Sequence, residues 1–250
     1  MLIILHCLII LSALSIGSFI NVIIYRLPKM LKDDQTINLA WPRSHCPNCK
    51  TRISLQHLIP IFSFLYLRRC CATCKQAISW RYPLIECITL LCVYLALWHY
   101  GFNLYCLTTI IFILWNIPLF IIDLEHQLLP DILTLSLLWI GLLLNTQAIY
   151  VPINAAIFGA AIAYSSLWLF IQIYYLITKK WGMGHGDFKL FAAYGAWFGW
   201  QKLPLLLFIA CLLGAIIGGL WLYYNKQSKE TPIAFGPFLI LAALLLSCST

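Results

Sequence analysis

The chain has 250 residues, of which 62% are hydrophobic and only 10% are charged. A soluble domain carries about 45–50% apolar and about 25% charged residues, so this composition excludes an ordinary soluble protein and indicates a polytopic membrane protein. The formal net charge of +8 does not predict nucleic-acid binding, because the basic residues lie where they would set membrane orientation. We expect a lipid bilayer, and no nucleic acid, as a partner.

Eight apolar segments are candidates for transmembrane helices, which need about 20 residues each. The first has no basic stretch before it, so we interpret it as a retained helix rather than a cleaved signal peptide. The sixth is the least distinct, because only Trp200, Gln201 and Lys202 separate it from the seventh. The segments cover residues 2–24, 83–100, 104–122, 132–149, 153–178, 188–201, 203–224 and 233–249. The predicted fold is therefore an all-α bundle of about eight transmembrane helices.

Lys and Arg are concentrated between the first two predicted helices. Residues 26–82 hold ten of the sixteen basic residues, so the positive-inside rule places this loop in the cytoplasm and the N-terminus outside. Threading eight helices from that start leaves only Lys202 on the outer side. The predicted domains are a first transmembrane helix at 1–25, a cytoplasmic loop domain at 26–82 and a seven-helix membrane domain at 83–250.

The predicted loop domain contains two CxxC pairs, Cys46-Pro-Asn-Cys49 and Cys71-Ala-Thr-Cys74. Four thiolates at this spacing are typical of a closed, tetrahedral structural zinc site. Metal binding would supply folding free energy to a loop that has few large apolar residues. The alternative is a pair of redox dithiols or unliganded cysteines, although a reducing cytosol disfavours stable disulfides.

Two acidic clusters also lie between apolar segments, at 123–131 and 184–189. Asp123 ends the third predicted helix and Asp187 begins the sixth, so the threading puts both at the same membrane face. A carboxylate beside hydrocarbon is costly and is therefore a candidate functional residue. The alternative is that both are solvated helix caps. That suits Asp131 and partly Asp187, but Asp123 follows a helix whose C-terminal dipole disfavours an anion.

Paired carboxylates predict the chemistry of an aspartyl protease. Two acids that share one proton can activate a water molecule for attack on a peptide carbonyl, while the neutral acid hydrogen-bonds the carbonyl oxygen. We therefore predict that Asp123 and Asp187 form a catalytic pair. The loop that supports this active site would consist of Gly182, Gly184, Gly186 and Lys189, in which the glycines allow the backbone to bend around a peptide.

Two other classes of function compete with this prediction. An ion-coupled transporter would place acids near the bilayer midplane and carry an inverted internal repeat. The sequence shows no such repeat, and both acids lie at helix ends. A zinc-dependent scaffold or thiol oxidoreductase built on the cysteine loop is the third hypothesis, and metal analysis would separate it from the others.

Five motifs occur together in one order along the chain. They are Gly17–Pro28, the two CxxC pairs, Ile78–Glu86, Ile122–Asp123 with Leu129–Asp131, and Gly182–Leu190. From about residue 10 to 240 the chain resembles the type IV prepilin peptidases, bacterial inner-membrane aspartyl proteases of the GxGD type. The resemblance implies cleavage of type IV prepilins or type II secretion pseudopilins after a glycine, with Asp123 and Asp187 as the catalytic aspartates. It also implies an active site that faces the cytoplasm, and the threading of eight helices places both termini on the opposite, periplasmic side.

Many members of that family also N-methylate the new N-terminus, so the resemblance implies S-adenosylmethionine as a cofactor beside zinc. The chain departs from the family pattern at Leu67-Arg-Arg-Cys-Cys71, where Arg69 stands at a position that is usually glycine and is associated with methyl transfer. A bulky cation there would obstruct a cofactor or force a different turn. A peptidase that has lost methyl transfer is therefore the alternative. No glycine-rich dinucleotide fingerprint supports a cofactor site independently, and the cofactor-binding residues stay unknown.

Overall fold

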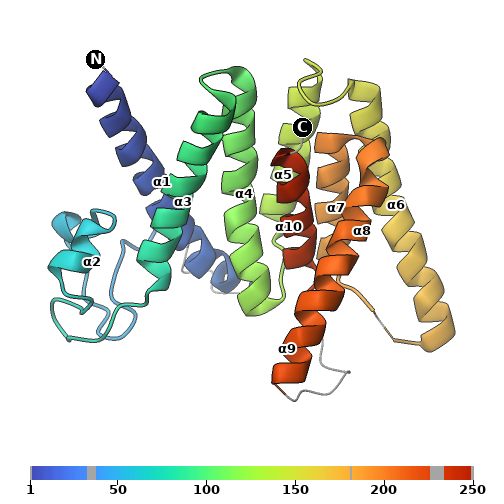
Figure 1. The fold of residues 1–250 in the computed structure, drawn as a ribbon. Helices are drawn as coiled ribbons and strands as arrows, with labels where there is room; N and C mark the ends of the chain where they lie inside the picture. The colour runs from blue at the N-terminus through green and yellow to red at the C-terminus, as the bar shows by residue number, and fades with distance from the viewer. Residues whose placement is uncertain (1, 33–37, 181, 226–233, 249–250) are drawn as a thin grey trace. The chain divides into compact units, whose positions relative to one another are not determined.

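The structure is a computed structural model that describes residues 2–32, 38–180, 182–225 and 234–248. Each of the eight predicted segments contains a helix in these ranges, but residues 146–149 and 234–235 are not helical, and residues 233 and 249 lie outside the described ranges. The helices are α1 Leu2–Leu31, α2 Phe62–Tyr66, α3 Arg81–Tyr100, α4 Leu104–His126, α5 Asp131–Asn145, α6 Ile153–Thr178, α7 His185–Phe198, α8 Leu203–Leu213, α9 Gly219–Tyr224 and α10 Gly236–Cys248 (Figure 1). A π-helix at Gly214–Gly218 joins α8 to α9.

Five of the described helical segments are long and apolar enough to cross a membrane. They are Ile4–Leu31, Arg81–Tyr100, Leu104–His126, Ile153–Thr178 and Trp200–Tyr224. Length and composition therefore support five of the eight predicted spans. The helices α5, α7 and α10 have 15, 14 and 13 residues, which is shorter than the roughly 20 that a bilayer requires.

The chain divides into two compact units, residues 1–110 and 111–250. In the first unit, α1 packs against α3. Gly17 permits this close approach, because a Cβ atom there would lie 2.9 Å from the Cα of Glu86. α1 also runs past Arg26 and Pro28 to Leu31, seven residues beyond the predicted end at residue 24.

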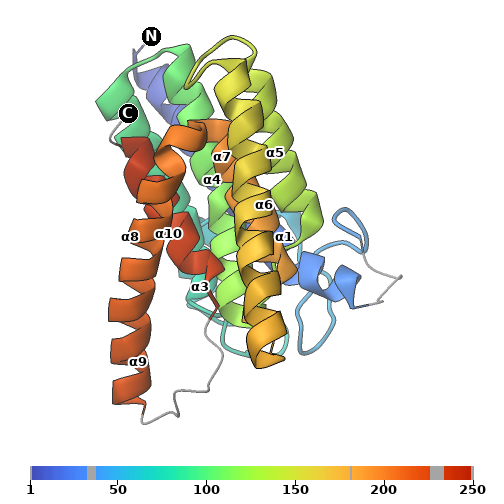
Figure 2. The ribbon, with the colours of Figure 1, turned by 90° about the vertical axis from the view of Figure 1, so that its right-hand side faces the viewer.

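In the second unit, α7 packs against α5 and α6 (Figures 1 and 2). Eleven of its 14 residues are buried, as expected for a helix that is apolar on all sides. The buried polar groups of α7 are paired: the Tyr194 hydroxyl donates to Asn116 Oδ1 at 2.5 Å, and Trp197 Nε1 donates to the Leu137 carbonyl at 2.8 Å. α7 is thus a central helix that fixes the position of Asp187 at its first turn.

The outer face of α6 carries exposed, large apolar side chains. They include Phe158, Ile162, Leu169, Phe170 and Ile173. A soluble protein rarely exposes so continuous an apolar surface, whereas contact with lipid carries no such cost. The exposed surface of this helix therefore agrees with the membrane character that its length and composition indicate.

Candidate functional site

The two predicted catalytic carboxyl groups both lie in the second unit and are both buried. Asp123 is near the C-terminal end of α4 with 5% of its surface exposed, and Asp187 is in the first turn of α7 with 8% exposed. Among the described residues, none donates a hydrogen bond to Asp123 Oδ2. An unpaired buried acceptor costs about 1–3 kcal/mol, so this oxygen is suited to receive a proton donor from water or a bound peptide.

Two glycines bring the surrounding helix ends close to these acids. A Cβ atom at Gly236, the first residue of α10, would overlap Asp123 Oδ2. A Cβ atom at Gly186 would lie 2.7 Å from the Cβ of Leu129. Both glycines are therefore required for packing. The predicted role of Gly186 in flexibility receives no support from this contact.

The other two glycines of the predicted active-site loop also lie beside α7 and α6. Gly184 is the residue that precedes α7, and its carbonyl accepts the backbone N–H of Asp187 at 3.2 Å. A Cβ atom at Gly182 would lie 3.1 Å from the ring of Tyr174. The loop is thus held closely at both positions.

Lys189 contacts Asp131 rather than Asp123 or Asp187, the two acids that the sequence predicts as a catalytic pair. Its Nζ atom donates to both carboxylate oxygens of Asp131, each at 2.7 Å. This ion pair joins the first turn of α7 to the first residue of α5. Lys189 therefore acts on the position of α7, and Asp131 is an exposed ion-pair partner rather than a member of the buried pair.

The four predicted metal ligands meet in the first unit. The sulfur atoms of Cys46, Cys49, Cys71 and Cys74 all lie within 4.8 Å of one another, with 3.8 Å between Cys46 and Cys74 and 4.0 Å between Cys49 and Cys71. Four sulfurs at about 2.3 Å from a tetrahedral zinc ion would be roughly 3.8 Å apart. The cluster can therefore bind a metal ion such as zinc with little rearrangement.

The backbone around each CxxC pair forms the same tight turn. The N–H groups of Lys50 and Lys75 donate to the carbonyls of Cys46 and Cys71 at 2.9 and 3.1 Å, and both lysines have positive φ, 56° and 57°. The Thr51 hydroxyl donates to the Cys49 sulfur at 3.1 Å, and this hydrogen bond is the main reason that the pKa of Cys49 is lowered to about 6. A thiolate is the form that binds zinc, so the environment favours the ligand state.

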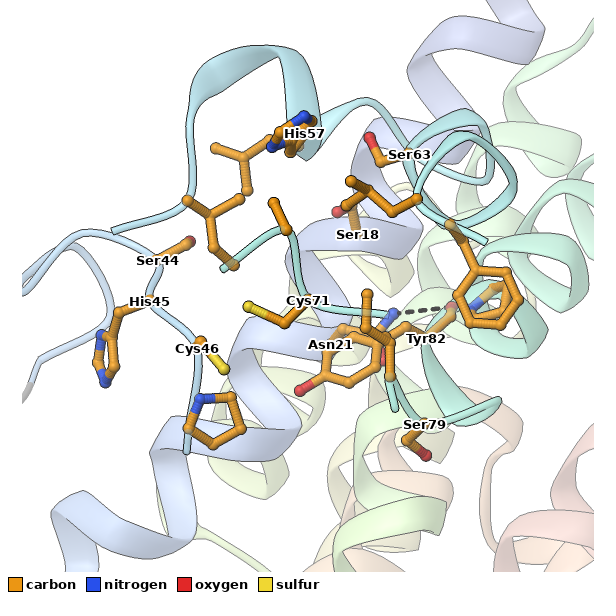
Figure 3. Close-up of a pocket in the computed structure, with 18 of the residues that line it drawn as sticks. Ser18, Asn21, Ser44, His45, Cys46, His57, Ser63, Cys71, Ser79 and Tyr82 are labelled. Carbon is orange, nitrogen blue, oxygen red and sulfur yellow. Dashed lines mark hydrogen bonds between the residues drawn. The ribbon is translucent and has the colours of Figure 1, made fainter. Parts of the chain in front are cut away.

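A cavity of about 790 Å³ lies beside this cluster, within the first unit (Figure 3). Cys46 and Cys71 belong to its lining, together with Asn21 of α1 and Glu86 of α3. Ligand sites commonly have volumes of about 300–1,000 Å³ and a few polar groups among apolar ones. The cavity is therefore large enough for a cofactor or a peptide end.

Arg69, the departure from the family pattern, is not among the residues that line this cavity. Its guanidinium lies over the ring of Trp80, 5.1 Å from the ring centroid. Its φ is 66°, in the left-handed region that glycine adopts most easily. The backbone at Arg69 therefore has the left-handed conformation that explains why a glycine is usual at this position.

Two buried carboxyl groups in a helical membrane protein are the groups that the chemistry of an aspartyl protease requires. Residues 11–100 match the family model of the bacterial peptidase A24 N-terminal domain, and residues 110–219 match that of the type IV leader peptidase family. The chain belongs to the type IV leader peptidase family. It is therefore an enzyme, a prepilin peptidase, and the boundary between the two matches falls where the structure divides into two units.

Curated relatives agree over nearly the whole chain. Proteins named prepilin leader peptidase/N-methyltransferase are 46% identical in Legionella pneumophila, 41% in Pseudomonas aeruginosa and 44% in Aeromonas salmonicida. The matches cover 94%, 93% and 94% of this chain and 88%, 86% and 87% of the relatives. No solved structure matches the chain. The resemblance stated from the motifs is thus confirmed, and with the apolar helices it indicates an integral protein of the inner membrane.

Proposed function

We propose that Asp123 and Asp187 are the catalytic residues of this peptidase. The observation that carries the proposal is the burial of two carboxyl groups at the ends of α4 and α7, beside glycines that allow close approach. The substrates are type IV prepilins or type II secretion pseudopilins, which the enzyme cleaves after a glycine. The buried pair also explains why a charged residue is retained at the end of an apolar helix.

The chemistry follows from two acids that share one proton. The ionised carboxylate removes a proton from water as the water oxygen attacks the scissile carbonyl carbon, and the neutral acid donates a hydrogen bond to the carbonyl oxygen. Collapse of the tetrahedral intermediate breaks the C–N bond, and the acid that took the proton from water gives it to the leaving amine. Any titration of activity belongs to the pair rather than to Asp123 or Asp187 alone.

The proposed topology has eight helices in the membrane, with both termini in the periplasm. Support comes from the ten basic residues of the loop at 26–82, which the positive-inside rule places in the cytoplasm. The short helix α7 is buried by its neighbours, so it need not meet the length requirement of a lipid-facing span. The proposed functional domains are 1–25, the zinc-binding loop at 26–82 and the peptidase domain at 83–250, with the active site facing the cytoplasm.

We also propose methyl transfer to the new N-terminus as a second activity. The names of the relatives support it, as does a cavity of about 790 Å³ whose lining includes a buried carboxyl group and a buried amide. S-adenosylmethionine, when bound, supplies an electrophilic methyl group. The residues of the chain would hold and orient the donor and the amine. The position of Arg69 outside the cavity favours retention of this activity over its loss.

The test is to incubate purified protein with a prepilin, with and without S-adenosylmethionine, and to analyse the products by mass spectrometry. Asp123→Asn and Asp187→Asn are each expected to abolish cleavage, while Asp131→Asn, a matched acid-to-amide change outside the buried pair, retains part of it. Methylation would appear as a mass increase of the cleaved product only when the donor is present. Normal cleavage by either of the first two variants would refute the assignment.

A further inference from the structure

A hydrogen bond joins the two helices that hold the proposed catalytic carboxyl groups. The hydroxyl of Tyr194 on α7 donates to Asn116 Oδ1 on α4 at 2.5 Å. Asn116 Nδ2 donates to the Phe112 carbonyl, one turn earlier in α4, at 2.8 Å. The reverse orientation of the amide would place two acceptors together, so its oxygen is the atom directed at α7. Neither side chain takes part in the peptide cleavage chemistry.

Both of these side chains are enclosed by the second unit. Asn116 is 1% exposed and Tyr194 is 0% exposed, so a substrate cannot reach either of them. An apolar pair would fill the same space without burying two polar groups, which is costly unless they are bonded to each other. What the polar pair adds is direction, because hydrogen bonds between helices of a membrane bundle hold them at one relative position.

The hydrogen bond lies two helical turns from the carboxyl groups on both helices, which run antiparallel (Figures 1 and 2). On α4, Asn116 is seven residues before Asp123. On α7, Tyr194 is seven residues after Asp187. Seven residues make almost two complete turns and span about 10 Å of helix. On each helix, the hydrogen-bonding side chain and the carboxyl group therefore point to nearly the same side.

Aromatic rings form the neighbouring contact between α4 and α7. The ring centroid of Phe112 on α4 lies 4.8–5.9 Å from the centroids of three rings on α7, those of Tyr194, Trp197 and Phe198. Apolar packing of this kind is non-directional and tolerates a small slide of one helix along the other. A hydrogen bond between two oxygens is lost when they separate by roughly 1 Å more. The polar contact therefore defines the register of the two helices more sharply than the rings do.

Asp123 belongs to the last part of α4, which follows Pro118. Proline has no N–H, so one backbone hydrogen bond of the helix is missing between Asn116 and Asp123. Leu119 and Ile122 are both fully buried, and close packing holds this last part of α4 in place against its neighbours. A shift of α4 at Asn116 is therefore passed on to Asp123.

We propose that the hydrogen bond between Tyr194 and Asn116 is a positioning contact for peptide cleavage. It sets how far α4 is displaced along α7, and thereby how the two carboxyl groups that share a proton are aligned. The inference rests on the proposed catalytic pair. It adds two positioning residues that act through this pair and do not touch the substrate.

The experiment measures steady-state cleavage of a prepilin by the full-length, zinc-loaded protein in lipid nanodiscs. Tyr194→Phe removes only the hydroxyl, and Asn116→Leu replaces the amide by an apolar group of similar size. Because a misplacement of about 1 Å can cost about 10²-fold in rate, each change is expected to lower kcat by about tenfold. KM is expected to stay within about twofold of the wild type, since neither side chain reaches the substrate.

The double variant Asn116→Leu/Tyr194→Phe separates positioning from stability. Each single change leaves one buried polar group without its partner and lowers Tm, whereas the double change removes both groups and is expected to restore Tm. A positioning contact predicts that kcat stays low in the double variant although its fold is as stable as the wild type. Recovery of kcat together with Tm would show that the contact only stabilises the fold, and the proposal would be overturned.

Ser136→Ala is the matched control for a hydrogen bond on the same helix. Trp115 Nε1 donates to Ser136 Oγ at 2.8 Å, and this contact joins α4 to α5 instead of α7. Its loss is expected to leave kcat close to that of the wild type. A fall in kcat as large as that of Tyr194→Phe would contradict a specific role for the contact with α7.

Asp123→Asn and Asp187→Asn show which of two statements fails. Normal cleavage by either variant means that the proposed catalytic pair is wrong. If both variants lose cleavage while Tyr194→Phe keeps the wild-type kcat, the catalytic pair stands and only the positioning role is overturned.

Discussion

Gly236 is the residue at which the buried carboxyl pair is most sensitive to a single added atom. A Cβ atom there would overlap Asp123 Oδ2, so Gly236→Ala must displace either the carboxyl group or the start of α10. Because small errors in the position of a catalytic group cost about 10²-fold in rate, we expect cleavage of a prepilin to fall by at least tenfold. Initial rates with a purified prepilin measure the effect.

Gly219→Ala is the matched control for this change. A Cβ atom at Gly219 meets nothing within 4 Å, and the residue begins the helix α9. Alanine is favoured over glycine in helices by up to about 1 kcal/mol, so this variant should be as stable as the wild type or slightly more stable. A Gly236→Ala protein that cleaves at the wild-type rate would show that Asp123 need not occupy its observed position.

Thr51 is predicted to strengthen metal binding although it is not a ligand. Its hydroxyl donates to the Cys49 sulfur at 3.1 Å, and hydrogen bonds of this kind commonly change metal affinity by about 10–100-fold. Thr51→Val is therefore expected to weaken zinc binding about tenfold in a competition with a chromophoric chelator. Thr73→Val, within the other CxxC pair, removes a threonine hydroxyl that is not bonded to sulfur and serves as the control. Equal affinity of both variants would contradict the prediction.

At the residue scale, the sequence predicts the chemistry of side chains better than their contacts. The spacing of Cys46, Cys49, Cys71 and Cys74 was enough to predict a metal cluster because four thiolates have few other reasons to recur in that pattern. Nothing in one sequence links Gly236 to Asp123, since the contact joins helices more than 100 residues apart. The Gly-Pro pair at 236–237 marks a helix start but not what it packs against.

At the element scale, the ion pair between Lys189 and Asp131 fixes the first turn of α7 against α5. The two side chains are 29% and 59% exposed, so the pair contributes only about 0.2–1 kcal/mol to folding. Lys189→Met should therefore change the melting temperature little, yet reduce cleavage several-fold because Asp187 lies two residues away. Asp131→Asn should have a similar, partial effect.

Reversal of the pair separates this positioning role from a loss of charge near the site. The double variant Asp131→Lys/Lys189→Asp is expected to recover part of the cleavage that each single reversal removes, because the contact is restored with opposite signs. A double variant no better than the single reversals would exclude the ion pair as the cause. Steady-state kinetics that separate kcat from KM would show whether substrate binding is altered instead.

Each predicted segment contains a helix, but the sequence did not predict every helix end or which helices are enclosed by others. Apolar runs predict helices well, because an unpaired backbone cannot lie in lipid. They do not show which helix faces lipid, and α7 was predicted as one span among eight although it is enclosed by its neighbours. The extension of α1 to Leu31 was missed because Pro28 normally ends or kinks a helix.

At the scale of the whole molecule, the chain is two compact units, and the cysteine cluster lies in the first of them. The division at residues 110 and 111 agrees with the two family matches at 11–100 and 110–219. Asp123, Asp187 and Gly236 lie in the second unit, whereas the cysteine cluster and the cavity lie in the first. The composition of the sequence indicates a membrane protein. Only the structure shows that the buried carboxyl groups and the cysteine cluster belong to different compact units.

Removal of zinc should therefore affect the two proposed activities unequally. The cysteine cluster contributes Cys46 and Cys71 to the lining of the cavity, and a small loop without a large apolar core depends on its metal for folding. A strong chelator is expected to reduce methylation by more than tenfold and cleavage by less than about threefold, because no cysteine of the cluster lies in the unit that holds the carboxyl pair. Both products can be measured in one reaction by mass spectrometry, with added zinc restoring methylation. A parallel loss of the two activities would mean that the peptidase also requires the metal-stabilised loop, and the separation of function between the units would be rejected.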